Sequence, residues 1–306
     1  MSKPHWTDSV YAEVTEKIIA QLEAGTIPWR KPWASNCQPA QNLVSRKAYR
    51  GINAIVLGFS EFASPYWATF NQVKSLGGSV IRGSKSSLVV FYKLVEKKDA
   101  QGRVMYSESG RPLGFPMLRY SRVFNAEQCE GLTLPATPEP AAVQDADEAH
   151  LETAKQVADA WKDCPVHIMG ASACYSPSLD VIRMPAMETF DCKASFYHTL
   201  FHEMGHATGH GTRLDREGIT AKDARFGSDV YSKEELIAEF AASFVGNITG
   251  ILDQVQLENS AAYVANWLKV LKDDRKLIVA AASAGQRAAD YILRAGQTEL
   301  AEDESK

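Results

Sequence analysis

The chain contains 306 residues, of which 45% are hydrophobic and 23% are charged. This length favours two domains over one, and the composition is that of a globular protein and excludes a fibrous or disordered chain. No apolar run approaches the roughly 18 residues that cross a bilayer, and the N-terminus does not read as a signal peptide, so we expect a cytoplasmic protein without membrane contact. The five cysteines are scattered and never form a CxxC pair, which fits free thiols in a reducing compartment.

The net charge of −4 conceals an asymmetry between the two halves of the chain. Residues 1–134 carry 17 lysines and arginines against 10 acidic residues, whereas residues 135–306 carry 16 against 27. A basic half joined to an acidic half indicates that the two halves have different roles and that the first binds a polyanion. The charge alone also fits a mildly basic surface, so nucleic-acid binding needs further support.

The first half shows both helical and strand patterns. Its first 25 residues form an amphipathic helical pattern, and residues 66–78 predict a short helix that is stopped by paired glycines. Residues 87–95 and 118–126 predict two partner strands, separated by a long exposed loop rich in glycine and lysine. The sequence therefore predicts an α+β domain over residues 1–134.

The clearest boundary is the segment LPATPEPAAVQDADEA, which is rich in proline, alanine and acid. We expect residues 135–149 to form a solvated linker that couples two domains mainly by raising their local concentration. Residues 150–306 then form a second α+β domain. Its predicted elements are a helix over 150–163, strands over 166–170 and 173–185, helices over 192–209 and 232–246, and a helical tail over 260–295.

The sequence FHEMGHATGH places His202 and His206 four residues apart, with Glu203 directly after the first histidine. On a helix both rings project from one face and can bind one ion. Glu203 is then placed to take a proton from a metal-bound water, whose pKa zinc lowers towards 7. We predict His202 and His206 as ligands of Zn²⁺ and Glu203 as the general base, with another divalent metal such as Mn²⁺ as the alternative.

Histidines continue this stripe at His198 and His210. We expect His198 to be an ordinary core or surface residue. A metzincin would supply its third histidine at position 212, which is Thr212 here, so the third ligand must come from elsewhere. His210 and Tyr231 both stay open as groups that stabilise an oxyanion.

The third ligand is expected in the segment YSKEELIAEFAASF, where Glu235 and Glu239 stand four residues apart. In gluzincins a glutamate on a second helix is the third ligand, and an acidic group one turn later supports a ligand histidine. Small residues on the glutamate side of this helix and on the first helix permit close approach of the two. We predict Glu235 as ligand and Glu239 as the orienting group. The reverse assignment, with Glu239 as ligand, stays open, and Glu234 ranks last as a ligand. The alternative without a metal is a capping box between Ser232 and Glu235.

The chain resembles the ArdC-type antirestriction proteins of conjugative plasmids over nearly its whole length. In the first half the resemblance rests on IPWRKPW, YRGINAIVL, SPYWATFNQVKSLGGSVIRG, VVFYK and VFNAEQCEGL. In the second half it rests on YSPSLDVIRMP, HEMGHATGHGTRLDR, YSKEELIAEFAASF and the helical tail. This resemblance implies a domain that binds single-stranded DNA, a zincin-like metallopeptidase domain, and protection of entering plasmid DNA from host restriction during conjugation.

Aromatic rings interleaved with cations in the first half fit single-strand binding, because bases stack on rings while lysines and arginines follow the phosphates. Prolines hold PWRKPW extended, so we expect its tryptophans to be the better stacking candidates. The predicted DNA-binding residues are Trp29, Arg30, Lys31, Trp33, Arg46, Lys47, Tyr49, Arg50, Tyr66 and Lys74.

Two alternative functions remain open. One is a general zinc metallopeptidase with an accessory DNA-binding domain; the other is a non-enzymatic single-strand binder with a structural metal. Three ligands with a glutamate beside them favour an open, catalytic site over a structural one. Host restriction proteins are the expected partners besides DNA, and we expect DNA binding to be required for protection while peptidase chemistry is dispensable.

Overall fold

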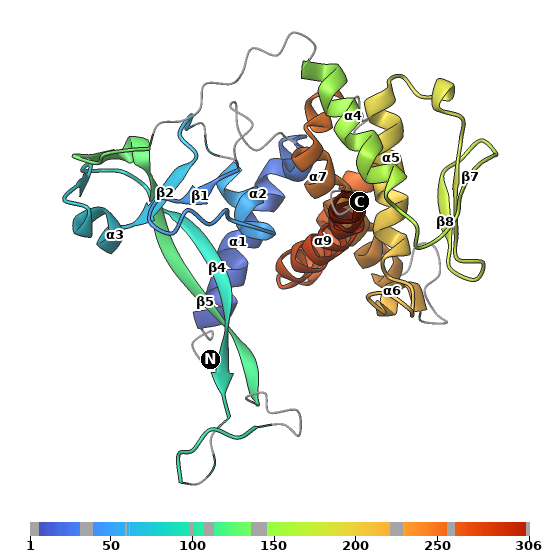
Figure 1. Cartoon of the computed structure of the whole chain (residues 1–306). Coiled ribbons are helices and arrows are strands. Elements are labelled where there is room, and N and C mark those ends of the chain that lie inside the picture. Colours follow the sequence, from blue (N-terminus) through green and yellow to red (C-terminus); the bar gives the residue numbers. More distant parts are fainter. Residues whose placement is uncertain are drawn as a thin grey trace.

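The computed structural model describes residues 6–30, 39–58, 60, 62–97, 99, 101–106, 113–135, 146–220, 229–255 and 261–303. Figure 1 shows a sheet-containing N-terminal half beside a mainly helical C-terminal half, with α1 and α9 between them. Both halves combine helices with a small sheet, so the chain is α+β with two domains, as the sequence predicts.

The N-terminal half is built on a four-stranded sheet in the order β1-β2-β5-β4. The strands are β1 (Gln41–Asn42), β2 (Tyr66–Thr69), β4 (Ser87–Glu96) and β5 (Gly114–Asn125); β3 (Ser79–Val80) and β6 (Cys129–Glu130) form a separate pair. The helices are α1 (Trp6–Glu23), α2 (Ile52–Gly58) and α3 (Phe70–Ser75), with short 3-10 turns η1 (Pro28–Arg30) and η2 (Ala126–Gln128). Both predicted partner strands are confirmed as the antiparallel pair β4 and β5, which projects as a long ribbon (Figure 1).

The predicted helix over residues 66–78 is partly wrong, because its first four residues form strand β2. Tyr66–Thr69 pairs with β1 on one side and β5 on the other, and this sheet pairing outweighs local helical preference. The helix begins only at Phe70, where Thr69 and Gln72 form a capping box.

Helix α2, which the sequence analysis did not anticipate, covers the outer edge of β4. The Asn53 amide donates to the Val90 carbonyl at 2.6 Å and its oxygen accepts from the Val90 N–H at 2.8 Å. An exposed strand edge can pair with a strand of another chain. The Asn53 side chain occupies the N–H and the carbonyl of Val90, so it blocks such pairing at this point of the β4 edge.

The C-terminal half is mainly helical and carries a three-stranded sheet, in the order β7-β9-β8, at its outer side (Figure 1). Its elements are α4 (Ala146–Asp159), β7 (Val166–Ile168), β8 (Cys174–Ser176), β9 (Val181–Met184), η3 (Met187–Thr189), α5 (Lys193–Ala207), α6 (Glu217–Thr220), α7 (Asp229–Thr249), η4 (Ile251–Gln254), α8 (Ala261–Asp273) and α9 (Leu277–Asp303). The predicted helices are confirmed, although α4 begins inside the expected linker. Residues 136–145 of that linker lie outside the described ranges.

One hydrophobic core extends through both halves, which overturns the expectation that a linker alone couples them. Ile18 of α1, Ile55 of α2 and Leu88 of β4 belong to the same buried cluster as Phe240 of α7 and Ile278 of α9. Burying apolar surface between the halves stabilises one arrangement of them. Within the described ranges, no helix combines the length and apolarity needed to span a bilayer.

Candidate metal centre

Helices α5 and α7 approach each other closely because small residues face one another where they cross. A Cβ atom on Gly205 would lie 3.1 Å from the Ala238 Cα and 3.2 Å from the Ala241 Cβ. The short side chains bring the two backbones together, as the sequence analysis expected. This contact sets the histidines of α5 opposite the glutamates of α7.

His202, His206 and Glu235 converge on one point. The two Nε2 atoms lie 3.1 Å apart, and each lies 3.4 Å from a different oxygen of Glu235. Ligands about 2.0–2.1 Å from a tetrahedral zinc ion stand about 3.3 Å from one another, so these separations fit three ligands of one ion. Two imidazoles and one carboxylate are also the donor set of catalytic zinc sites with an open position. These three residues could hold a divalent metal.

A second carboxylate lies beside each histidine ring. Glu239 Oε2 lies 3.5 Å from His202 Nδ1, and Glu234 Oε1 lies 3.5 Å from His206 Nδ1. Partners of this kind fix the ring and its tautomer so that Nε2 faces the metal. Glu239 thus occupies the position expected of the orienting group, and Glu234, ranked last as a ligand, lies beside the other histidine.

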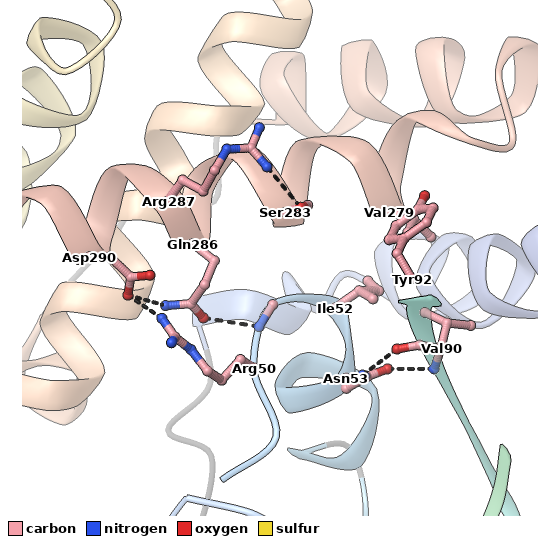
Figure 2. Close-up of a pocket in the computed structure, with 11 residues that line it drawn as sticks. Arg50, Ile52, Asn53, Val90, Tyr92, Val279, Ser283, Gln286, Arg287 and Asp290 are labelled. Atoms are coloured by element: carbon pink, nitrogen blue, oxygen red, sulfur yellow. Dashed lines mark hydrogen bonds and ion pairs between the residues drawn. The ribbon is translucent and has the colours of Figure 1, made fainter. Parts of the chain in front are cut away.

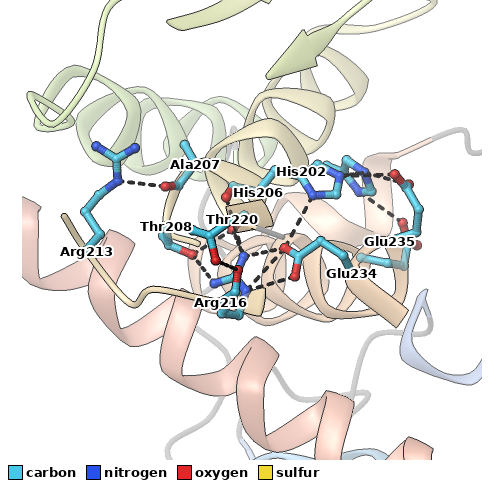
Figure 3. A network of polar contacts seen from close by, with 11 residues as sticks. His202, His206, Ala207, Thr208, Arg213, Arg216, Thr220, Glu234 and Glu235 are labelled. Carbon is cyan, nitrogen blue, oxygen red and sulfur yellow. Dashed lines mark hydrogen bonds and ion pairs between the residues drawn. The ribbon is translucent and has the colours of Figure 1, made fainter. Parts of the chain in front are cut away.

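Arginines from two distant segments hold these orienting carboxylates. Arg30, in the N-terminal half, donates from Nε to Glu239 Oε1 at 2.6 Å. Arg216 binds Glu234 and also donates to the Gly205 carbonyl at 2.7 Å, near the end of α5 (Figure 3). A Cβ on Gly209 would lie 2.8 Å from Arg216 Nη2, so the glycine leaves room for this guanidinium.

The electrostatics of the centre follow from these contacts. Burial alone would raise the pKa of Glu235 and Glu239, but histidines beside both and Arg30 beside Glu239 hold each pKa well below its usual range. Burial opposes a positive charge on His202, yet the two carboxylates raise its pKa well above the usual value. A cation bound here takes the place of histidine protons, so metal binding and proton release are linked.

A cavity of about 170 Å³ opens beside this site. It is lined by Arg30, His198, Thr199, His202, Glu235, Glu239 and Trp267. His198 is a buried residue, as expected, and burial lowers its pKa to about 4, which keeps the ring neutral. The cavity thus lies next to two of the three candidate ligands, His202 and Glu235.

The remaining predicted groups of this half have the following places. Glu203 is buried on α5 directly after His202. His210 lies beyond the end of α5, where its Nδ1 is 2.8 Å from Thr212 Oγ1, and Tyr231 is half-buried on α7.

The expected exposure of Trp29 is wrong. Its ring is fully buried, with its centroid 4.9 Å from that of Phe240 and 5.2 Å from that of Trp267. An aromatic ring in this position adds to the core between the halves and cannot stack on a base. Arg30, next in the chain, is directed to Glu239 and not to solvent.

The other DNA-binding candidates divide by exposure. Tyr66 is 4% exposed, with the Arg46 guanidinium 5.1 Å from its ring centroid, so its ring is not an open stacking platform. Tyr49 is half-buried and accepts a hydrogen bond from Asn42, whereas Lys47 and Lys74 are exposed. Arg50 pairs with Asp290 of α9. Lys31 and Trp33 lie outside the described ranges.

Both parts of the chain match known families. Residues 8–124 match the N-terminal domain of the anti-restriction factor ArdC, and residues 152–284 match a zincin-like metallopeptidase family. A zincin-like domain implies a divalent metal, in agreement with the donor set of His202, His206 and Glu235.

Curated relatives align with almost all of this chain. Two DNA primases TraC from Escherichia coli are 36% and 35% identical and cover 94% and 95% of it, but the chain spans only 20% and 28% of their length. Protein y4eC of Sinorhizobium fredii is 31% identical over 94% of this chain and 93% of its own length.

Solved structures of an antirestriction ArdC protein from plasmid R388 are similar throughout. The metal-free form is 36% identical with a TM-score of 0.68, covering 94% of this chain and 98% of that one. The Mn(II)-bound form is 35% identical with a TM-score of 0.69, covering 94% and 97%. The chain therefore belongs to the ArdC family of antirestriction proteins.

Proposed function

We propose that this protein binds single-stranded DNA, carries a zinc-dependent peptidase centre, and protects entering plasmid DNA from host restriction during conjugation. The convergence of His202, His206 and Glu235 at 3.1–3.4 Å carries the enzymatic part of the proposal. Similarity to the R388 protein, which is an antirestriction protein, supports the biological part.

Within the metal centre each residue has a distinct proposed role. His202, His206 and Glu235 hold the ion, which when bound supplies Lewis acidity towards a water molecule and a peptide carbonyl. Glu203 takes the proton of the attacking water on its carboxylate and delivers it to the leaving amine. Glu239 and Glu234 keep the two imidazoles in the tautomer that presents Nε2 to the ion.

The shared core changes how the two activities are expected to relate. The sequence analysis expected DNA binding to be required for protection and peptidase chemistry to be dispensable. Because Trp29 and Arg30 of the DNA-binding half pack against Phe240 and Glu239 of the metal half, we propose that protection requires both.

Replacement of the general base tests this requirement. Glu203→Gln should keep the metal, the fold and DNA affinity, because the amide has nearly the same shape and Glu203 is not one of the three ligands. It should lose about 10²–10⁴-fold in peptide cleavage, the usual contribution of a general base. Conjugal transfer into a restricting recipient should fall to the level of a plasmid without the gene.

Full protection by Glu203→Gln, with normal metal content and DNA affinity, would rule out peptide cleavage as the mechanism of protection. Coating of the DNA strand by the protein would then be the mechanism. Lys193→Ala is the control variant. Lys193 is exposed at the start of α5, away from His202 and His206.

The N-terminal half offers a ring and a cation side by side on its ribbon. Phe91 of β4 is 46% exposed and lies directly opposite Arg119 of β5 in the antiparallel register. Directly paired residues project from the same face, so an exposed ring and an exposed guanidinium share one surface. We propose that a base stacks on Phe91 while Arg119 meets a phosphate.

Phe91→Ala should weaken binding of a labelled oligothymidylate by about 1–3 kcal/mol without changing metal content, since base stacking is the interaction removed. Fluorescence anisotropy on the full chain measures this. Leu134→Ala is the control, because Leu134 is exposed to a similar degree, 41% against 46%, and lies after the last strand of this half. Equal affinities for both variants and the wild type would remove Phe91 from the DNA surface.

A further inference from the structure

A pocket lies where the two halves meet, between α2, the edge of β4 and α9. Its volume is about 220 Å³, enough for a phosphate and part of a sugar. It is lined by Arg50, Gly51, Ile52, Asn53, Val90, Tyr92, Val279, Ser283, Gln286, Arg287 and Asp290 (Figure 2). We call it the junction pocket. None of the roles assigned above explains it.

Two arginines, one from each half, line this pocket. Arg50 has a side chain that is 57% exposed and is paired with Asp290. Arg287 is exposed on α9 and donates a hydrogen bond to the neutral Ser283 hydroxyl at 3.1 Å. Two guanidiniums against one carboxylate leave the pocket with an excess of positive charge, which suits an anion.

An exposed aromatic ring stands at the rim of the pocket. Tyr92 is 48% exposed, and its hydroxyl is 3.0 Å from that of Tyr11 on α1, which holds the ring in place. Lys276 lies 5.8 Å from the Tyr11 ring centroid. A cation and two aromatic rings therefore lie next to one another at the boundary between the halves, and rings beside cations are the groups that bind single strands.

Hydrogen bonds that do not involve Tyr11 or Tyr92 hold the backbone around the pocket in place. Gln286 accepts from the Gly51 N–H at 3.0 Å, and Asn53 satisfies both backbone groups of Val90. These bonds fix the start of α2 against α9 and β4 (Figure 2). The two guanidiniums and the tyrosine ring are thus presented by a rigid frame, which lowers the cost of ordering them on a ligand.

We propose that the junction pocket binds one nucleotide of a single DNA strand, with its phosphate on Arg287, its base on Tyr92 and the next phosphate of the strand on Arg50. The zincin-like half then contributes directly to the DNA surface through α9. This inference rests on the proposed single-strand binding and extends it from the N-terminal half to the boundary of both. Asp290 competes with the phosphate for Arg50.

The test measures binding of a labelled oligothymidylate to the full chain over a range of salt concentrations. Arg287→Ala should weaken binding about tenfold and make the dependence of log K on log salt shallower by about 0.7, the loss of one phosphate contact. Asp290→Asn should change affinity in the opposite direction, because it frees Arg50. Lys269→Ala, which removes an exposed cation of α8 outside the pocket, should change neither quantity.

The tyrosine distinguishes stacking from a structural role. Tyr92→Ala should weaken binding at least fivefold, whereas Tyr92→Phe, which keeps the ring but loses the hydroxyl contact with Tyr11, should restore nearly normal affinity. Equal losses in both variants would mean that the hydroxyl contact matters and the ring does not, against the proposal.

Thymidine monophosphate is the second probe and separates a strand from a free nucleotide. If it binds saturably and Arg287→Ala abolishes that binding while oligothymidylate affinity is unchanged, the pocket serves a free nucleotide and the proposal is overturned. If the wild type binds oligothymidylate but Arg287→Ala has the same affinity and salt dependence, the junction pocket does not bind the strand. The proposed function then stands without it. A wild type that binds no oligothymidylate refutes both.

Discussion

Glu235→Ala is expected to leave the protein folded but almost free of metal. Glu235 is the only one of the three candidate ligands on α7, and its two oxygens each lie 3.4 Å from a histidine Nε2. Removing a partner that only orients a ligand costs about 10–100-fold in metal affinity, so removing a ligand should cost more. Zinc content after dialysis, measured against the wild type, gives the result.

Glu203→Gln is the matched control for this experiment, since it changes a neighbouring carboxylate on the other helix without removing a ligand. Glu239→Gln should give an intermediate result, because it weakens the support of His202 and releases Arg30. Full metal occupancy in Glu235→Ala together with loss in Glu239→Gln would exchange the two roles, an alternative that the sequence left open.

Trp29→Ala should reduce the free energy of unfolding by about 3–5 kcal/mol, the cost of removing a large aromatic side chain from a core. The ring is fully buried between Phe240 and Trp267, so its loss leaves a cavity between the two halves. Urea denaturation followed by circular dichroism measures the change. Trp29 is followed by Arg30, which donates to Glu239, so metal affinity should fall as well.

Phe70→Ala is the comparison, because Phe70 belongs to the same half and is 55% exposed. It should change stability by less than about 0.5 kcal/mol, as surface substitutions usually do. A Trp29→Ala protein with unchanged stability but weakened DNA binding would restore the stacking role that the sequence suggested and contradict the packing described above.

The candidate metal site could be recognised in the sequence because its signal is local. His202, Glu203 and His206 lie within one helical turn, and helical geometry alone places both rings on one face. Glu235 and Glu239 show the same four-residue spacing, and the small residues on both helices indicate the close crossing at Gly205 and Ala238. The two strands that became β4 and β5 were also predicted, since their alternation and composition are local properties.

The supporting arginines could not be predicted, because each acts across a long separation in the chain. Arg30 stands 209 residues before Glu239, and Arg216 reaches Glu234 only because the chain folds back after α5. Local pattern made PWRKPW look like an exposed DNA-binding segment, whereas packing against α7 buried its first tryptophan. Tyr66 was misjudged for the same reason, since its pairing in β2 decides its exposure.

The sequence by itself determined the α+β class, the histidine pair with its glutamate, and the two carboxylates on the second helix, because each depends on periodicity within a single element. Only the tertiary structure decided that the two halves share one core, that Arg30 of the first half holds Glu239 of the second, and that Arg50 and Arg287 line one pocket. Those relations depend on which apolar faces bury each other, and the free energy of that burial is set by the whole chain and not by any one segment.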